Sequence, residues 1–398
     1  MQGSSVELGA WLRISTPPHT TPTPLSWRRL LPPPPNPSLP KFLSSSSTTT
    51  TTLDSQTLTY LIDFCGLSRE SAISASQKLH LKSTEKPSAV LGLFREYGFG
   101  KTDISKIITK IPTLLTCDPH KILKPKLDFF RSVGFSGDAL SRLIALSPLL
   151  LRRSLEDHLI PCFTFLRTLL HSNDNVVAVF SHAPHALNSN LVKTIMPSLQ
   201  VLRKHNLPEE RIAKLVTVQP GILMQAPGRV NEIVEEVNAT GIQTSDPIFI
   251  YAFGTLSGLK RSTWERKMAV YKSFGWSEME VLMAFRKQPM CMKMSEEKIK
   301  EGLEFYFNKL KLRPDDIIRY PKLLMPSLEK TIVPRCTVLS VFQKEEKLGK
   351  KLKFSAILTL PARLFLKRFV MRYHKDIPDV LKAYSGEIKF DGLEIDRG

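Results

Sequence analysis

Basic side chains gather in the segment after Pro361, at spacings that suit contact with phosphate groups. Arg363 and Lys367 lie four residues apart, and so do Arg368 and Arg372. Because residues four apart share one face of an α-helix, the segment is predicted to show two basic pairs. The pairs would lie beside an apolar stripe of Leu364, Leu366, Phe369 and Val370. Such a face can line a phosphate-binding groove and gain affinity from released counterions; the alternative interpretation is an ordinary solvated helix face.

A second set of basic residues recurs beside prolines. Arg286 and Lys287 come just before Pro289, and Lys322 directly follows Pro321. One basic position per repeat would form a ladder along one wall of the fold, which suits the regular spacing of a nucleic-acid backbone. Further basic residues are equally suited to loops or outer faces: Lys260, Arg261, Arg266, Lys267, Lys309, Lys311 and Arg313.

The residue patterns that catalysis needs are missing from the sequence. His182 and His185 flank Pro184, but no Cys, Asp or Glu stands beside them at metal-ligand spacing. The acidic pairs at 296–297 and 315–316 stand where helices are expected to start, and carboxylates there stabilise the helix dipole. There is no Gly-rich phosphate loop, no HExxH motif and no nucleophile–base pattern. The sequence therefore predicts no enzymatic activity, metal, cofactor or small-molecule substrate.

The net charge of the chain predicts an acidic partner. The formal charge is +19, with a sequence pI of about 9.7. Residues 258–398 hold 30 basic and 18 acidic residues (+12), whereas residues 54–257 hold 22 and 18 (+4). A bias of this kind favours nucleic acid over an anionic membrane surface as the partner. No apolar run approaches the ~20 residues that a bilayer-spanning helix needs.

The elements that would position these residues are set by a recurring proline. Prolines followed by apolar residues stand 36 residues apart three times in succession, at 112, 148, 184 and 220, and recur at 289, 321 and 361. The gap between 220 and 289 is close to two periods, and Gly254-Thr255-Leu256 fills the missing place without a proline. A period in this range is typical of a helical array.

Each period reads as two helices joined by a short turn. The proline ends one helix, because the preceding residue is driven out of the helical region. Pro125, Pro161 and Pro197 are expected in the first turn of the next helix, where a missing N–H is tolerated. Leu149 and Leu150, in the turn itself, are expected to plug the core between repeats. The fold is therefore predicted to be an all-α helical-repeat solenoid.

The chain divides into three parts on this interpretation. Residues 1–53 are rich in Pro, Ser and Thr, contain four basic residues against one acid, and are predicted to be an organellar transit peptide rather than a disordered tail without an address. Residues 54–385 form the array, with a half repeat at 54–98 and then about eight repeats of ~36 residues. Residues 386–398 are predicted to be a polar tail. The five cysteines are widely spaced and are expected to be reduced, mostly buried thiols.

The proline-x-Leu-Leu turn, the second proline about 13 residues later, the Gly-Phe helix end and the basic leader together resemble the mTERF (mitochondrial transcription termination factor) family, of the type found in plant organelles. The segment from Leu58 to Ser68 is also similar to the opening of plant members. This resemblance implies a right-handed, half-ring solenoid of mTERF repeats, each with two α-helices and a 3₁₀ turn. It also implies a basic concave groove for duplex nucleic acid, with roles in transcription termination or regulation, intron splicing or ribosomal RNA maturation.

We therefore expect a monomeric protein that binds double-stranded DNA and regulates organellar transcription, in the mitochondrion or alternatively the chloroplast. The contact residues predicted from the sequence are Arg286, Lys287, Lys322, Arg363, Lys367, Arg368 and Arg372. One alternative is an RNA-binding factor for intron splicing or rRNA maturation. Another is a protein–protein scaffold, which would not explain the basic bias of the last third.

Overall fold

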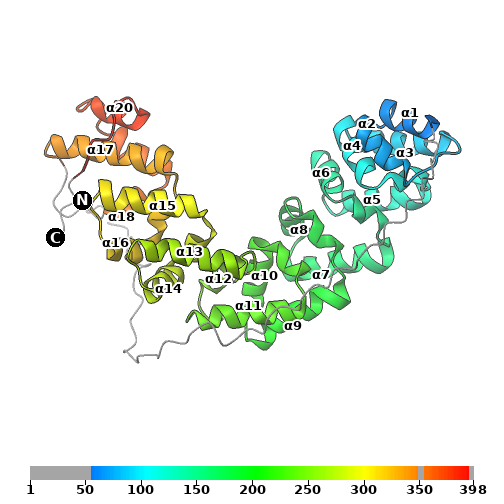
Figure 1. The fold of residues 1–398 in the computed structure, drawn as a ribbon. Helices are drawn as coiled ribbons and strands as arrows, with labels where there is room; N and C mark the ends of the chain where they lie inside the picture. Colours follow the sequence, from blue (N-terminus) through cyan, green and yellow to red (C-terminus); the bar gives the residue numbers. More distant parts are fainter. Residues whose placement is uncertain (1–54, 348–353, 394–398) are drawn as a thin grey trace, which may run out of the picture. The chain divides into compact units, whose positions relative to one another are not determined.

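The computed structural model describes residues 55–347 and 354–393, and every regular element in these ranges is a helix (Figure 1). The segment predicted to be a transit peptide, residues 1–53, lies outside the described residues. The first elements are α1 (Ser55–Asp63), α2 (Arg69–Ser76), α3 (Glu85–Glu96), α4 (Lys101–Lys110) and the 3₁₀ turn η2 (Pro112–Thr116). The prediction of an all-helical repeat fold is confirmed.

Three units then follow the same order: a π turn, a first helix, a second helix and a 3₁₀ turn. The first consists of η3 (Pro119–Leu123), α5 (Lys124–Ser132), α6 (Asp138–Leu146) and η4 (Pro148–Arg152). The second consists of η5 (Leu155–Leu159), α7 (Ile160–Leu170), α8 (Asn173–Phe180) and η6 (Pro184–Asn188). The third consists of η7 (Leu191–Ile195), α9 (Met196–Lys204), α10 (Glu209–Val218) and η8 (Pro220–Met224).

The later units vary this order. Two helices without a turn come first, α11 (Pro227–Ala239) and α12 (Phe249–Leu256). They are followed by α13 (Arg261–Ser273), α14 (Glu278–Lys287) and η9 (Pro289–Lys293), then by α15 (Glu296–Glu304), η10 (Phe305–Lys309), α16 (Pro314–Arg319) and η11 (Pro321–Leu324). The last elements are η12 (Leu328–Ile332), α17 (Val333–Lys344), α18 (Phe354–Leu358), α19 (Ala362–Phe365), η13 (Leu366–Val370) and α20 (Asp379–Ser385).

Helix starts follow the turn proline at a fixed distance. The residue six positions after the proline is Asp118, Ser154, Asn190 or Ser327, and each side chain accepts a hydrogen bond from a backbone N–H of the next turn. The capped segment opens as a π turn, one turn before the α-helical part that contains Pro125. A proline ring clashes with the carbonyl four residues earlier in a regular α-helix, and a widened turn at this point relieves that clash. Pro125 is therefore near the start of α5, as predicted, but the continuous helical segment begins earlier.

Helix ends use a left-handed residue followed by a buried apolar one. Gly134 has φ of 113°, and the N–H of Phe135 donates to the carbonyl of Phe130 at 3.0 Å. This six-to-one bond closes the helix and turns Phe135, which is fully buried, into the core. The Gly-Phe pattern in the sequence therefore marks a real helix end.

The place without a proline has no turn either. The helix α12 runs through Gly254 to Leu256, and the hydroxyl of Thr255 is buried and donates to the carbonyl of Tyr251 at 2.8 Å. Without a proline nothing ends the helix at 254, so it continues for one more turn. The unit formed by α11 and α12 thus lacks the 3₁₀ element that the period alone would predict there.

The 3₁₀ turn buries only one of the two leucines expected in the core. Leu150 is fully buried, whereas Leu149 is 52% exposed. The prediction that both plug the core is wrong for Leu149, because the turn has one exposed side and Leu149 lies on it. Pro148 and Leu151 of the same turn are also buried. We call these buried turn residues, and their equivalents in other turns, the wall.

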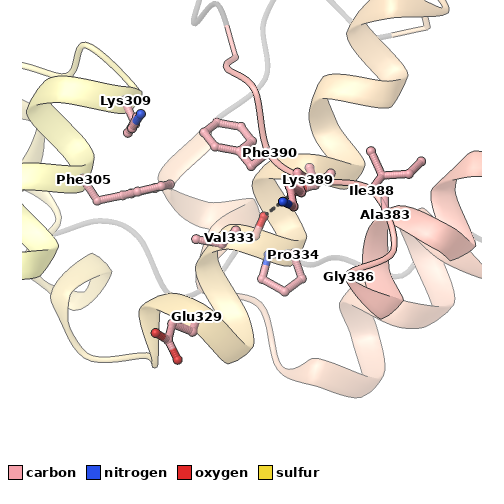
Figure 2. Close-up of a pocket in the computed structure, with 11 residues that line it drawn as sticks. Phe305, Lys309, Glu329, Val333, Pro334, Ala383, Gly386, Ile388, Lys389 and Phe390 are labelled. Carbon is pink, nitrogen blue, oxygen red and sulfur yellow. Dashed lines mark hydrogen bonds between the residues drawn. The ribbon is translucent and has the colours of Figure 1, made fainter.

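The last described residues pack on the array. Leu393 is 6% exposed, the ring of Phe390 lies 5.7 Å from that of Phe305, and Lys344 pairs with Asp391 at 2.9 Å. Figure 2 shows Phe390 and Phe305 beside an open cavity of 340 Å³, with Pro334 of α17 among its lining residues. The stretch 386–393 is therefore not the polar tail predicted from the sequence; residues 394–398 lie outside the described ranges.

Candidate nucleic-acid interface

Buried polar side chains hold each 3₁₀ turn in place. The ammonium group of Lys126 on α5 donates to the carbonyl of Leu151 at 2.7 Å, and Lys267 on α13 donates to the carbonyl of Met292 at 2.8 Å. Arg335 donates likewise to the carbonyl of Leu358 at the end of α18. Corresponding bonds join the first helical segments of other units to the turns that end those units: His158 to Leu187, Ser198 to Gln225 and Lys298 to Met325. These bonds satisfy carbonyls that a 3₁₀ turn leaves without a helical partner. The first helix of a unit thereby fixes the position of the turn that ends the unit. We call the exposed side of these turns the turn edge.

Lys267 is among the basic residues that the sequence assigns to loops or outer faces, but the structure buries it. Lys267 is only 5% exposed, and Lys126 is 8% exposed. Desolvation lowers the pKa of both amines, because the charged form loses hydration that one carbonyl does not fully replace. Lys267 therefore supports the turn and is removed from the set of possible phosphate contacts.

The 3₁₀ turns of neighbouring units contact one another in two runs, one on each side of the α11–α12 unit. Contacts join η4 to η6, η6 to η8, and η9 to η11. The side chains presented along the turn edge come mainly from two positions: two residues before the turn proline and one residue after it. In the later units these positions are held by Lys287, Arg319 and Lys322, which we call the basic ridge.

The basic ridge brings three cations close to one another. All three side chains are exposed, and the Nζ of Lys287 donates to the carbonyl of Ile318 at 3.2 Å. Partial desolvation and then the nearby Arg319 charge lower the pKa of Lys287. None of the three forms an ion pair with a carboxylate in the described residues. Such a cluster is stabilised by an external polyanion.

Arg319 belongs to this ridge, but it was not among the contact residues predicted from the sequence. Arg319 stands two residues before Pro321, as Lys287 stands two residues before Pro289. Aligning the repeats on their prolines would have found it. Lys287 and Lys322, both predicted, do lie on the same edge, because η9 and η11 are in contact.

Arg286 is separated from the ridge. Its Nε donates to the carbonyl of Thr240 at the end of α11, and its guanidinium lies over Gly241. Gly241 has φ of +90°, and a Cβ at that position would come within 2.9 Å of the guanidinium, so this close approach requires glycine. The structure thus gives Arg286, which is exposed, an internal bond between two units that the sequence did not predict.

The basic segment after Pro361 has a different geometry from the expected α-helix. The helix α19 ends at Phe365, η13 continues as a π turn, and Arg372 lies in the turns beyond it. The segment is therefore not the single α-helix that was expected: Arg363 and Lys367 lie on either side of the change from α19 to η13, and Arg372 lies beyond η13. Arg363, Lys367 and Arg368 are nevertheless all exposed, and the guanidinium of Arg372 lies 5.6 Å from the ring of Tyr373.

The apolar side of this segment holds it to the end of the array. Phe365 and Val370 are fully buried, and the guanidinium of buried Arg335 lies 4.9 Å from the ring of Phe365. The segment η13 packs on α20. The predicted contact residues thus fall into two groups, the basic ridge and this C-terminal segment, with Arg286 in neither.

Other candidate groups have structural roles. The carboxylate of Asp316 accepts the N–H of Arg313 at 2.9 Å, as expected for an acid at a helix start. His182 and His185 are exposed on the turn edge at Pro184, and the described residues contain no group of three side chains placed to hold a metal ion. In the same ranges, no helix has the length and apolar character of a membrane span.

Comparison with known proteins agrees with the repeat geometry. The mTERF family model matches residues 79–365, more than two thirds of the chain. This chain belongs to the mTERF family. No curated protein matches it. Membership in the mTERF family brings nucleic-acid binding and organellar transcription-related regulation as the class of function, and the basic ridge lies within the matched mTERF region.

Proposed function

We propose that this mTERF protein binds double-stranded DNA and regulates organellar transcription, by termination or related control. The observation that carries the proposal is the basic ridge, where Lys287, Arg319 and Lys322 are exposed without an acidic partner in the described residues. Arg363, Lys367 and Arg368 add a second exposed basic group. Phosphate contacts from these side chains supply most of the affinity, and the bound protein obstructs the polymerase on its template.

A salt series on the purified chain tests the proposal. Labelled duplex DNA, duplex RNA and single-stranded RNA of one sequence are titrated, and the slope of log affinity against log salt is measured for each. We expect duplex DNA to bind most tightly, with a steep negative slope of about 0.9 per neutralised phosphate. Tighter binding of either RNA would contradict the DNA assignment and favour splicing or rRNA maturation.

A pair of variants assigns that affinity to the ridge. Arg319→Glu with Lys322→Glu is compared with Lys204→Glu with Lys78→Glu, which changes the net charge equally at exposed positions elsewhere. We expect the ridge variant to lose at least about tenfold in duplex affinity and to have a salt slope shallower by about 2. Equal losses in both variants would mean that only the total charge matters.

The organellar part of the proposal rests on residues 1–53, whose composition favours a transit peptide. A fusion of these residues to a fluorescent protein should enter the mitochondrion, or in a plant cell alternatively the chloroplast. A fusion that remains in the cytosol would contradict the assignment.

A further inference from the structure

The turns η4 and η8 present exposed apolar side chains on the edge where the later turns present basic ones. Leu146, Leu149, Val218 and Met224 are 39%, 52%, 46% and 54% exposed. We call these four residues the apolar ridge. They belong to the ends of α6 and α10 and to the turns η4 and η8, and η6 contacts both turns. The four residues therefore lie on one edge, in two groups with exposed His182 and His185 of the η6 unit between them. Exposed apolar groups that recur along one edge indicate a binding surface.

Cations flank the apolar ridge. Arg142 lies one helical turn before Leu146 on α6, and Lys214 lies one turn before Val218 on α10, so each cation shares a face with its apolar neighbour. Arg152 ends η4. All three are exposed, and none is ion-paired to a carboxylate in the ranges that the structure describes.

From this arrangement we infer that the apolar ridge docks an amphipathic helix of a partner protein, with acidic residues on both sides of its apolar face. The apolar side chains fit the apolar face of such a helix, and Arg142, Arg152 and Lys214 complement its carboxylates. A phosphate backbone gains nothing from four exposed apolar groups, so nucleic acid is a poorer match for this edge. The inference concerns different residues from the proposed DNA contacts and does not depend on them.

The length of the ridge sets the size of the docked helix. Packed helices lie about 10 Å apart, so two repeats cover roughly 20 Å along the edge. An α-helix rises about 1.5 Å per residue, and about 13 residues, or nearly four turns, therefore match the ridge. Apolar residues at i, i+4, i+7 and i+11, which span about 16 Å of one helix face, would meet it.

The test uses the full chain and two labelled synthetic peptides of about 18 residues. Both have leucines at these apolar positions; one carries glutamates and the other lysines on the flanks. Fluorescence anisotropy should show the acidic peptide binding at least about tenfold more tightly than the basic one. Equal affinities, or no binding of the acidic peptide, would overturn the proposal.

Two variants locate the site. Leu149→Ser with Met224→Ser should weaken the acidic peptide about tenfold, whereas Met279→Ser with Leu381→Ser, at exposed apolar positions elsewhere, should not change it. Arg142→Glu with Lys214→Glu should reverse the preference between the two peptides. Unchanged peptide binding in the ridge variants would place the site elsewhere and refute the assignment.

The same variants separate the other possible occupants. Duplex DNA affinity should be unchanged in Leu149→Ser with Met224→Ser; a parallel loss would make the ridge part of the nucleic-acid interface and overturn the protein partner. Sedimentation should show a monomer for both proteins. A concentration-dependent dimer that disappears in the ridge variant would identify a second copy as the occupant and also overturn the proposal.

Discussion

Equivalent positions on the turn edge have opposite chemistry in the two regions of this array. Two residues before the turn proline, the units that end in η4 and η8 have Leu146 and Val218, whereas the later units have Lys287 and Arg319. The units that end in η2 and η6 have Lys110 and His182 at this position, so the apolar chemistry is confined to η4 and η8. One residue after it, Leu149 contrasts with Lys322. The wall behind the edge is the same in both regions, since Leu150 and Leu323 are both buried.

The buried scaffold and the exposed binding surface therefore vary independently along the array. Buried positions are constrained by the neighbouring unit, and the carbonyls of the turn are bound by Lys126 in one region and Lys267 in the other. Exposed edge positions are less constrained by the neighbouring unit, although Lys287 donates to the carbonyl of Ile318. A substitution at an exposed edge position therefore changes the partner more than the stability. One protein can therefore carry an apolar and a basic surface on successive turns of one fold.

The largest expected effect separates wall from edge within a single turn. Leu150→Asp should lower the free energy of unfolding by about 4 kcal/mol or more, because it buries a carboxylate without a partner. Leu149→Asp should change it by about 0.5 kcal/mol or less, because the position is 52% exposed. Denaturant unfolding followed by circular dichroism measures both. Similar losses in the two variants would mean that the turn has no exposed side.

Lysines placed on the apolar ridge test whether the apolar and basic ridges bind different partners. Leu146→Lys with Leu149→Lys should weaken binding of the acidic amphipathic peptide about tenfold, because the apolar contacts are lost, while the fold stays intact. Its duplex DNA affinity should rise less than about threefold if DNA lies on the other region. A large gain in duplex affinity would show that DNA passes over both regions.

The shared wall should respond equally in the two regions. Lys126→Met and Lys267→Met each leave a carbonyl without its donor and should each cost about 1 kcal/mol at neutral pH, after the gain from removing a desolvated charge. The folded-state pKa of each lysine is lowered, so the wild-type contribution is greatest above the unfolded value of 10.5 and declines as the pH falls through the folded value. The cost of either substitution should therefore be greater near about pH 10 than at neutral pH. Unequal costs at the two positions would show that the two walls differ.

The smallest expected effect concerns the thiols packed behind the turns. Burial raises the pKa of Cys162 to about 11 and that of Cys291 to about 12, from 9.0. Their contribution to stability is complete below pH 9.0 and is lost as the pH rises toward those values. In the native protein a thiol reagent should therefore react readily only with Cys117, the one cysteine that is not buried. Rapid reaction of Cys162 or Cys291 would show that one wall opens more easily.

The helix ends, helix caps and turns of this protein can be derived from the sequence alone. The turn prolines such as Pro112 end the helix before them, whereas prolines such as Pro125 lie in the first turn of a helix. A glycine such as Gly134 adopts positive φ without strain, and Asp, Ser or Asn six residues after several turn prolines caps the next helix. These effects act over a few residues, so the repeat, the all-α fold and the basic bias of the last third can be predicted from the sequence.

Only the tertiary structure shows which side of each turn is exposed and which cations are held by bonds inside the protein. Leu149 and Leu150 are chemically identical, and only the neighbouring unit makes one buried and the other exposed. Arg286 and Lys267 look like surface charges, yet one bonds to the end of α11 and the other lies beneath a turn. Such contacts join residues 25 to 46 positions apart, and no local pattern encodes them.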